Sequence, residues 1–354
     1  MTAAFILLKH LSMPPKRVTQ KDIAAVVGVH DATVSLALRN HPSIPEETRR
    51  RIRLCAEELG YRPDPMLSAL SSYRSALRPH GFQGTLAWLT HDPDPQYNWS
   101  GIPHYRDYYI GANARAEECG YQLEPFEVRG ISMARIASIL RTRGIDGILI
   151  CPQPTPNAGI DLPWEHYSAV TFGYTLTNPQ LHMVTSAHFS AAAETVRELL
   201  NLGYKRIGFC LSSSHDTRVM HNFLGGYLME MKLAGLEPPE LHDETGPLED
   251  LKRWIERNQL DAVVSGGFGG LDRFLQMGIS IPEKLGVGCP TLGNPKSRFA
   301  GIVEDNIQIG RVGMDFVVAM AQRGERGIPV SAQHILVRGK WHVGESVRAR
   351  QVVG

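Results

Sequence analysis

The spacing of apolar positions divides this chain into a short helical region and a long region of alternating strands and helices. Residues 18 to about 60 show no strand-like alternation, and their apolar positions recur at the spacing of three short helices. The first helix opens at Thr19, three residues before Asp22, which is the spacing of a capping box. Its inward-facing apolar side chains are Ile23, Ala24 and Val27.

Two further helices complete the predicted head. We expect the second from about Asp31 to Arg39 and the third from about Glu46 to Leu59, where Gly60 provides a left-handed cap. The inward side chains of the second helix are Val34, Ala37 and Leu38. Since a helix-turn-helix places its second helix in the major groove of DNA, the outward positions become candidate DNA contacts.

Residues around this helix fall into two kinds of candidate DNA contact. Short hydroxyl side chains suit phosphates and fix register, whereas outward side chains of the helix suit base edges. The candidates in the head are Thr19, His30, Asp31, Ala32, Thr33, Ser35, Leu36 and Arg39.

A short linker helix is predicted after the head. Asp64 is a good N-cap and Pro65 suits a first helical turn, so the helix should run to about Tyr73. An isolated helix this short falls below the ~12–15 residues that are marginal in water, and it should need a partner to fold.

From Gly84 onward, buried strand-like runs alternate with amphipathic helices. The strand candidates are residues 85–89, 121–126, 145–151, 169–172, 206–211, 262–265, 285–287 and 301–303. Helices between them end in glycine, at Gly120, Gly144, Gly203, Gly235 and Gly278. This order is typical of βαβ units and a parallel sheet. The region exceeds one usual core, so we expect two α/β lobes with a ligand cleft at the carboxyl ends of their strands.

These elements predict an all-α helix-turn-helix head, a short linker helix and a two-lobed α/β region with parallel sheets. The expected bounds are 17–61 for the head, 62–80 for the linker and 81–354 for the two-lobed region. Lobe one should comprise about 81–184 and 306–328, and lobe two about 185–305 and 329–354. Residues 1–16 form an N-terminal extension before the head, and residues 1–12 of it are interpreted as added by a misassigned start codon, because Met13-Pro-Pro-Lys-Arg17 resembles a natural start.

Composition and charge place few further limits on the class of protein. The 354 residues are 43% hydrophobic and 21% charged, with a formal net charge of +1. Residues 16–80 carry eleven Lys and Arg against seven Asp and Glu, which fits a nucleic-acid-binding module or a solvated helical surface. The five cysteines are dispersed, and no apolar run approaches the ~20 residues that span a bilayer, so we expect a reducing, cytoplasmic location.

Sequence motifs of catalysis are not found. There is no P-loop, dinucleotide-binding glycine pattern, GxSxG or HExxH sequence. The glycine-rich run Gly266-Gly-Phe-Gly-Gly270 has the wrong spacing for a phosphate loop. The pair His215-Asp216 has no nucleophilic residue at a sequence spacing that indicates a catalytic motif. We therefore expect neither an enzyme, nor a metal site, nor a cofactor.

Several motifs resemble the lactose-repressor (LacI/GalR-type) family of bacterial transcriptional regulators. The head match is Val18-Thr-Gln-Lys-Asp-Ile-Ala-Ala-Val-Val-Gly-Val-His-Asp-Ala-Thr-Val-Ser35, continued by Pro45-Glu-Glu-Thr-Arg49 and Glu58-Leu-Gly-Tyr-Arg-Pro63. Later matches are Asn201-Leu-Gly-Tyr-Lys-Arg-Ile-Gly-Phe209, Ala300-Gly-Ile-Val-Glu-Asp-Asn306 and Gly327-Ile-Pro329. The likeness covers nearly the whole chain after residue 16.

The resemblance implies a sensor like periplasmic binding proteins and a homodimer that binds a near-palindromic operator, usually as a repressor. A small-molecule effector, such as a sugar, would control it. In the family, paired hinge helices enter the minor groove, where a Leu wedges between base steps. By position that residue is Leu70, with Met66 beside it, although Leu70 packed on the sensor is the alternative.

Departures from the family pattern concern both operator and effector. Leu36 stands where the family usually has Arg; it cannot bind guanine in a bidentate way but can touch a thymine methyl. Asp31 is expected to cap its helix rather than contact cytosine. Sugar-binding members carry Asp, Arg and Asp at the places of Ala187, Phe223 and Pro290, so we expect a less polar or differently bound effector, or none.

Candidate effector-binding residues are polar or aromatic side chains near the expected cleft. Trp99 and Tyr105 lie in the long loop after the first sensor strand, where stacking on a sugar ring is proposed. The full set is His91, Trp99, Tyr105, His188, Asn222 and Phe268. The main alternative function is a transport-type solute-binding protein, which would share the sensor fold but need no basic head.

Overall fold

The computed structural model describes residues 18–38, 44–61, 82–91, 98–128, 130–266 and 270–350. The chain divides into two compact units near residue 81. They are called here the head and the sensor, and each is described by itself. The predicted linker contacts Met66 and Leu70, the predicted contact Arg39 and the extension at 1–16 lie outside the described residues.

The head is built from three helices around a small apolar core. They are α1 (Gln20–Val27), α2 (Asp31–Leu38) and α3 (Glu46–Glu58). The Asp22 carboxylate accepts hydrogen bonds from Thr19 N and Thr19 Oγ1, both at 2.7 Å, and Gly28 ends α1 with φ of 75°. All predicted inward side chains of α1 and α2 join the core, together with Ile52, Cys55 and Ala56 of α3. The predicted helix-turn-helix is confirmed.

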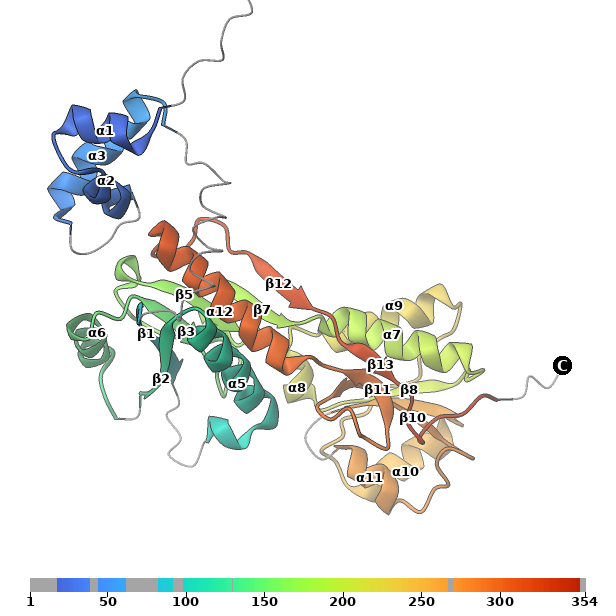
Figure 1. The fold of residues 1–354 in the computed structure, drawn as a ribbon. Helices are drawn as coiled ribbons and strands as arrows, with labels where there is room; N and C mark the ends of the chain where they lie inside the picture. Colours follow the sequence, from blue (N-terminus) through green and yellow to red (C-terminus); the bar gives the residue numbers. More distant parts are fainter. Residues whose placement is uncertain are drawn as a thin grey trace, which may run out of the picture. The chain divides into compact units, whose positions relative to one another are not determined.

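The sensor's first lobe is a six-stranded parallel sheet with helices on both faces. The sheet order is β12-β7-β5-β3-β1-β2. Alternation along β1 sends Leu86 and Trp88 into a core with α5 and α12, and Ala87 and Leu89 into a core with α6. Figure 1 shows α5 and α12 running beside each other on this lobe. The bounds are β1 (Gly84–Thr90), β2 (Tyr121–Glu127), β3 (Gly147–Ile150), β5 (Ser168–Phe172), β7 (His182–Ser186), β12 (His334–Val337), η1 (Trp99–Gly101), α5 (Pro103–Glu118), α6 (Met133–Thr142), η2 (Trp164–His166) and α12 (Asn306–Arg323), with β4 (Ala158–Gly159) and β6 (Leu176–Asn178) as a separate two-stranded sheet.

The second lobe is a five-stranded sheet of order β13-β11-β10-β9-β8, parallel except for β13. One face packs against α7 and α9 and the other against α10 and α11. The predicted glycine helix ends are confirmed, because all five have positive φ. The bounds are α7 (His188–Asn201), β8 (Ile207–Cys210), α8 (Ser213–Arg218), α9 (Asn222–Leu233), α10 (Leu248–Arg257), β9 (Ala262–Ser265), α11 (Gly270–Gln276), β10 (Gly286–Leu292), β11 (Ala300–Val303) and β13 (Lys340–His342).

The chain passes between the lobes three times, after β7, after β11 and after β12. The third crossing corrects the expected lobe bounds: residues 334–337 belong to lobe one, since β12 pairs with β7, and only β13 returns to lobe two. At this crossing a Cβ on Gly339 would lie 2.6 Å from Val303 O. A glycine is therefore required where the chain passes close to β11.

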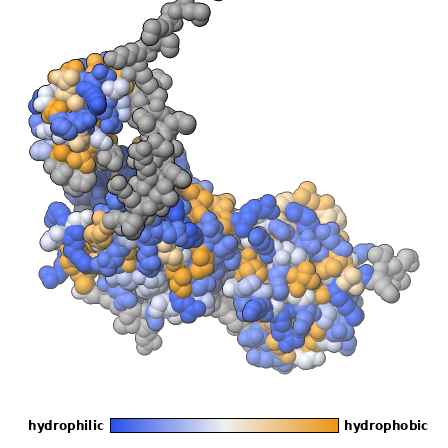
Figure 2. All heavy atoms as spheres, viewed as in Figure 1, coloured by the Kyte–Doolittle hydropathy of each residue, from blue (hydrophilic) through white to orange (hydrophobic). Residues whose placement is uncertain are grey.

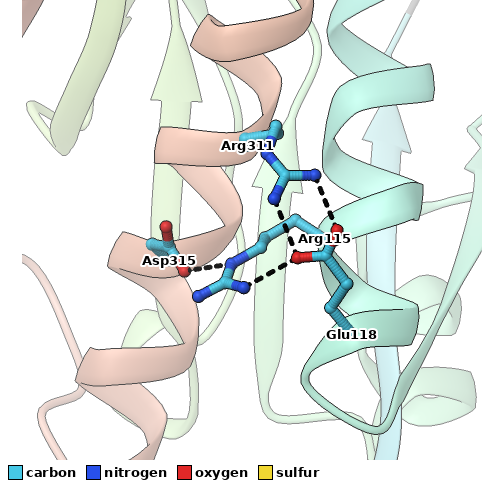
Figure 3. A network of polar contacts seen from close by, with 4 residues as sticks. All are labelled: Arg115, Glu118, Arg311 and Asp315. Atoms are coloured by element: carbon cyan, nitrogen blue, oxygen red, sulfur yellow. Dashed lines mark hydrogen bonds and ion pairs between the residues drawn. The ribbon is translucent and has the colours of Figure 1, made fainter.

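Helices α5 and α12 of lobe one approach each other closely. A Cβ on Gly111 would lie 2.0 Å from Ile307 O, and one on Gly310 would lie 1.9 Å from Tyr108 O. The same pair is joined at its surface by Arg115, Glu118, Arg311 and Asp315 (Figure 3): Arg311 donates twice to the Glu118 carboxylate, and Arg115 bridges Glu118 and Asp315. Arg311 and Arg115 lower the pKa of Glu118 to about 2.

The sensor surface in view is mostly hydrophilic (Figure 2), with apolar side chains interspersed. Exposed apolar side chains of the sensor include Phe189 on α7 and Leu228 and Leu233 on α9. Among the described residues, no helix is both long and apolar enough to cross a membrane. Nor does that part of the chain bring three or more His, Cys, Asp or Glu together as metal ligands.

Candidate DNA-binding face and effector cleft

Helix α2 presents a small, largely apolar face away from the head core. Val34 and Ala37 are buried, whereas Ala32 is exposed and Leu36 is half-buried without joining the core cluster. Ala32 and Leu36 are four residues apart and therefore neighbours on one side of the helix. Such a pair can make apolar contact with thymine methyls but offers no side-chain hydrogen bond to a base.

The start of α2 is organised by short local contacts. Asp31 Oδ1 accepts from Ala32 N at 2.9 Å and lies 2.8 Å from His30 Nδ1. This carboxylate therefore accepts from a backbone N–H in the first turn of α2, while His30 stays exposed and Thr33 and Ser35 are half-buried. Thr19 is exposed beside the head's first helix, with its hydroxyl hydrogen-bonded to Asp22.

We expect the effector cleft among the segments that follow the carboxyl ends of strands in both sheets. Gln153, Tyr174 and His188 come after β3, β5 and β7 of lobe one, and α8 and Glu304 come after β8 and β11 of lobe two. Ligands of open α/β sheets bind at this kind of edge. These side chains come from segments spread between residues 153 and 304 of the sequence.

One side chain, missed in the sequence reading, connects the two lobes. Arg218, at the end of α8, donates to Tyr105 Oη at 2.6 Å and to Gln153 O at 2.8 Å, and also to Pro154 O. All three acceptors belong to lobe one. Burial raises the pKa of Tyr105 against the opposing influence of Arg218, so its phenol is neutral and accepts the guanidinium hydrogen bond.

A second polar group lies deeper in the cleft. His188 Nε2 is 3.9 Å from Glu304 Oε1, and the other Glu304 oxygen accepts from Thr291 Oγ1 at 2.9 Å. Burial raises the pKa of Glu304, and burial, with the nearby His215 and His104, lowers that of His188 to about 3. Within the described chain, neither His188 Nδ1 nor Glu304 Oε1 forms a hydrogen bond.

The structure separates the predicted effector residues. Trp99 is unavailable for the ring stacking expected of it, because it is buried with its ring 5.5 Å from Trp88 and 5.3 Å from Tyr109. Tyr105 reaches the cleft, but through its hydroxyl rather than as a stacking ring. His188 lies in the cleft, and Asn222 donates its side-chain amide to Val219 O in the turn before α9.

The two remaining effector candidates add little to the cleft. His91 is half-buried directly after β1. Phe268 lies outside the described residues. Arg218 was missed because no local pattern marks it, and Glu304 was quoted within a family motif without being assigned a role. Both follow the ends of strands that are distant in the sequence.

Family models match two regions of the chain. Residues 19–64 match bacterial regulatory proteins of the lacI family, and residues 97–264 match periplasmic binding proteins and the sugar binding domain of the LacI family. The chain belongs to the lacI family of bacterial regulatory proteins. It is therefore a transcriptional regulator with a DNA-binding head.

Curated relatives and solved structures agree with this assignment. The chain is 24% identical to the HTH-type transcriptional regulator MalR of Streptococcus pneumoniae over 85% of this chain and 92% of that protein. It is 27% identical to the HTH-type transcriptional repressor CytR of Escherichia coli over 62% and 60%. Its fold is similar to a transcriptional regulator CelR–cellobiose complex (TM-score 0.57, 19% identity, 93% and 100% covered). The operator-bound lac repressor dimer is also similar (TM-score 0.56, 15% identity, 94% and 100% covered).

Buried apolar side chains occupy the three positions at which the resemblance predicts charged side chains in sugar-binding members. Ala187 and Pro290 are buried and apolar. Phe223 is fully buried, and its ring lies 5.0 Å from His188 and 5.7 Å from His215. Two histidine rings thus lie around the Phe223 ring, and the described arginine that joins the two lobes is Arg218.

Proposed function

We propose that this lacI-family protein is a cytoplasmic repressor that binds a near-palindromic operator as a homodimer and is controlled by a small molecule bound between its sensor lobes. A two-fold dimer matches a two-fold operator, because each head then meets one half-site. Among relatives, CytR is named a repressor, and the lac repressor structure is a dimer on operator DNA.

The outward side of α2 is the feature that carries the DNA-binding proposal. Burial of Val34 and Ala37 fixes which side of this helix packs, and so leaves Ala32 and Leu36 toward the groove. Thr19, Thr33 and Ser35 would hold phosphates, and Arg39, Met66 and Leu70 would extend the contact. Apolar contacts at Ala32 and Leu36 favour half-sites that present thymine methyls.

The effector proposal rests on the cleft. Buried polar atoms of His188 and Glu304 without hydrogen bonds inside the described chain are costly unless a ligand or water satisfies them. A ligand that binds one closure angle of the lobes more tightly shifts the population of operator-binding dimers. CelR, a structural relative, was solved with cellobiose.

Selection from fragmented genomic DNA tests the proposed function. Purified full-length protein should retain a small set of duplexes with two related half-sites at moderate salt, and sequencing identifies them. Each selected duplex is then measured by fluorescence anisotropy against a scrambled duplex of equal length. Equal affinity for selected and scrambled duplexes, with and without metabolite extract, would contradict the proposal.

A further inference from the structure

Arg218 carries a positive charge into the lobe junction without a carboxylate partner. Its hydrogen bonds go to a phenol oxygen and two backbone carbonyls, and it forms no ion pair with any described acidic residue. A guanidinium binds carboxylate or phosphate more strongly than neutral oxygens, because both partners are charged and two parallel hydrogen bonds can form.

Two acidic side chains on or near α8 are engaged by other groups, and a third, the buried Glu244 beside Ser212, forms no ion pair with Arg218 among the described residues. Asp216 accepts from Leu224 N at 3.2 Å and lies 2.8 Å from His221 Nδ1. Asp243 accepts from Ser213 N and from Thr245. Neither lies within ion-pair distance of the Arg218 guanidinium, so the charge stays uncompensated by the described chain.

Two histidines lie next to this guanidinium. The His104 ring is 5.7 Å from the Tyr105 ring whose hydroxyl accepts from Arg218, and His215 lies one helical turn before Arg218 on α8. Burial lowers the pKa of His104 to about 4, with further lowering by His215 and Arg218. This corner of the cleft thus disfavours any further positive charge and favours a negative one.

Several buried side-chain atoms could form hydrogen bonds with a ligand. Those without a hydrogen bond to the described chain include Gln153 Oε1, His188 Nδ1, Glu304 Oε1 and Asn306 Oδ1. The three oxygen atoms among them are acceptors and suit ligand hydroxyls, which donate. Because burial raises the pKa of Glu304, that group lies closer to neutrality and repels an anionic ligand less.

We propose that the effector is a polyhydroxylated metabolite carrying a carboxylate or phosphate, with its anionic group on Arg218 beside His104 and His215 and its hydroxyls toward His188, Glu304 and Asn306. This inference rests on the proposed effector control. Binding would replace the neutral oxygens now held by Arg218, so the contact that joins the lobes would pass through the ligand.

Matched pairs of small molecules test this inference on the full-length protein. The pairs are glucuronate against glucose and glucose 6-phosphate against glucose, with sodium phosphate and sodium sulfate against chloride at equal ionic strength. Isothermal titration and thermal unfolding report binding. We expect at least one anionic probe to bind ten-fold or more tighter than its neutral counterpart; the carboxylate and phosphate pairs distinguish the two kinds of anionic group.

Substitution of Arg218 tests whether this side chain is the cause of the preference for an anion. Arg218→Gln should abolish the preference for the anion, and Arg218→Lys, which keeps the charge, should retain part of it. Arg273→Gln is the matched control, because Arg273 is also half-buried in lobe two and donates to a backbone carbonyl, that of Gly246. It should leave the preference unchanged.

Three results would overturn the inference: neutral sugars that bind as tightly as their anionic partners, an anion affinity unchanged in Arg218→Gln, or no binding of any anionic probe at millimolar concentration. The genomic DNA selection is done without ligand, so it tests operator binding independently of the effector measurements. A protein that selects operators yet prefers neutral sugars would retain the proposed function and lose only the anionic effector.

Discussion

Arg218 Nη2 and Tyr105 Oη lie 2.6 Å apart although 113 residues separate them in the sequence. One belongs to the α8 segment of lobe two and the other to α5 of lobe one, so this hydrogen bond reports directly on lobe closure. A charged donor makes such a bond stronger than one between neutral groups.

Removing the phenol oxygen should loosen the lobes. Tyr105→Phe keeps the ring and deletes the acceptor, so we expect a loss of about 1–2 kcal/mol in sensor stability, measured by urea unfolding. Tyr109→Phe is the control, because Tyr109 Oη only approaches the neutral Leu123 carbonyl, at 3.4 Å. An equal loss in both variants would show that the lobe-to-lobe bond has no special role.

The close α5–α12 crossing should not tolerate a methyl group. Alanine normally stabilises a helix interior over glycine by up to about 1 kcal/mol. In Gly310→Ala the obstacle is backbone, Tyr108 O, which cannot rotate away, so overpacking should prevail with a net loss of about 1–3 kcal/mol. Gly293→Ala, with nothing within 4 Å of its Cβ, should be close to neutral. A Gly310→Ala variant more stable than the unmodified protein would contradict the close contact between α5 and α12.

Sensor stability should fall in mild acid because of His188. Its pKa is lowered from an ordinary value of 6.5 to about 3 in the folded protein. Below pH 6.5, His188 is therefore protonated in the unfolded chain but stays neutral in the folded chain. Stability contributed in this way is present above pH 6.5 and is lost as pH falls toward 3. Between pH 7.5 and 5.5 the loss for this one group is about 1.4 kcal/mol.

A neutral replacement isolates that effect. In His188→Gln, the difference in unfolding free energy between pH 7.5 and 5.5 should shrink by about 1.4 kcal/mol relative to the unmodified protein. Urea unfolding at the two pH values measures it. An unchanged difference would mean that His188 titrates normally in the folded sensor.

Leu36 should set base preference at one symmetric pair of operator positions. Leu36→Arg replaces an apolar side chain by one that can form two hydrogen bonds with guanine. The operators selected by this variant should therefore carry guanine more often at that pair of positions. Leu54→Arg on α3 adds the same charge at an exposed leucine of the head (50% exposed) and should raise affinity for all duplexes without changing the selected bases. Identical sequence preferences in both variants would remove Leu36 from the base-reading face.

Much of the fold was predictable because burial leaves a clear apolar signal. The head helices end within one or two residues of their expected ends, and strands such as Ala262–Val264 are short runs buried on both faces. The strand His182–Ser186 was missed because its residues include His, Thr and Ser, yet all five are buried. The edge strand His334–Val337 was missed because its side chains are partly exposed, and this displaced the predicted lobe boundary.

The site was less predictable than the fold, for a physical reason. Contacts of α2 follow from its own periodicity, so its outward residues could be named in advance. The cleft instead forms where strand ends of two sheets converge, and Arg218 has no sequence neighbour that marks it. Trp99 illustrates the opposite error: an aromatic residue in a long loop suggested ligand stacking, but its ring fills the core beside Trp88.

Reciprocal coupling between operator and effector tests the central account most directly. The Kd of a selected operator is measured with and without saturating effector, and the Kd of the effector with and without operator. If one cleft ligand controls the head, the two ratios must be equal, because the coupling free energy is a property of both sites together. A ligand that binds the sensor and leaves operator affinity unchanged would contradict it.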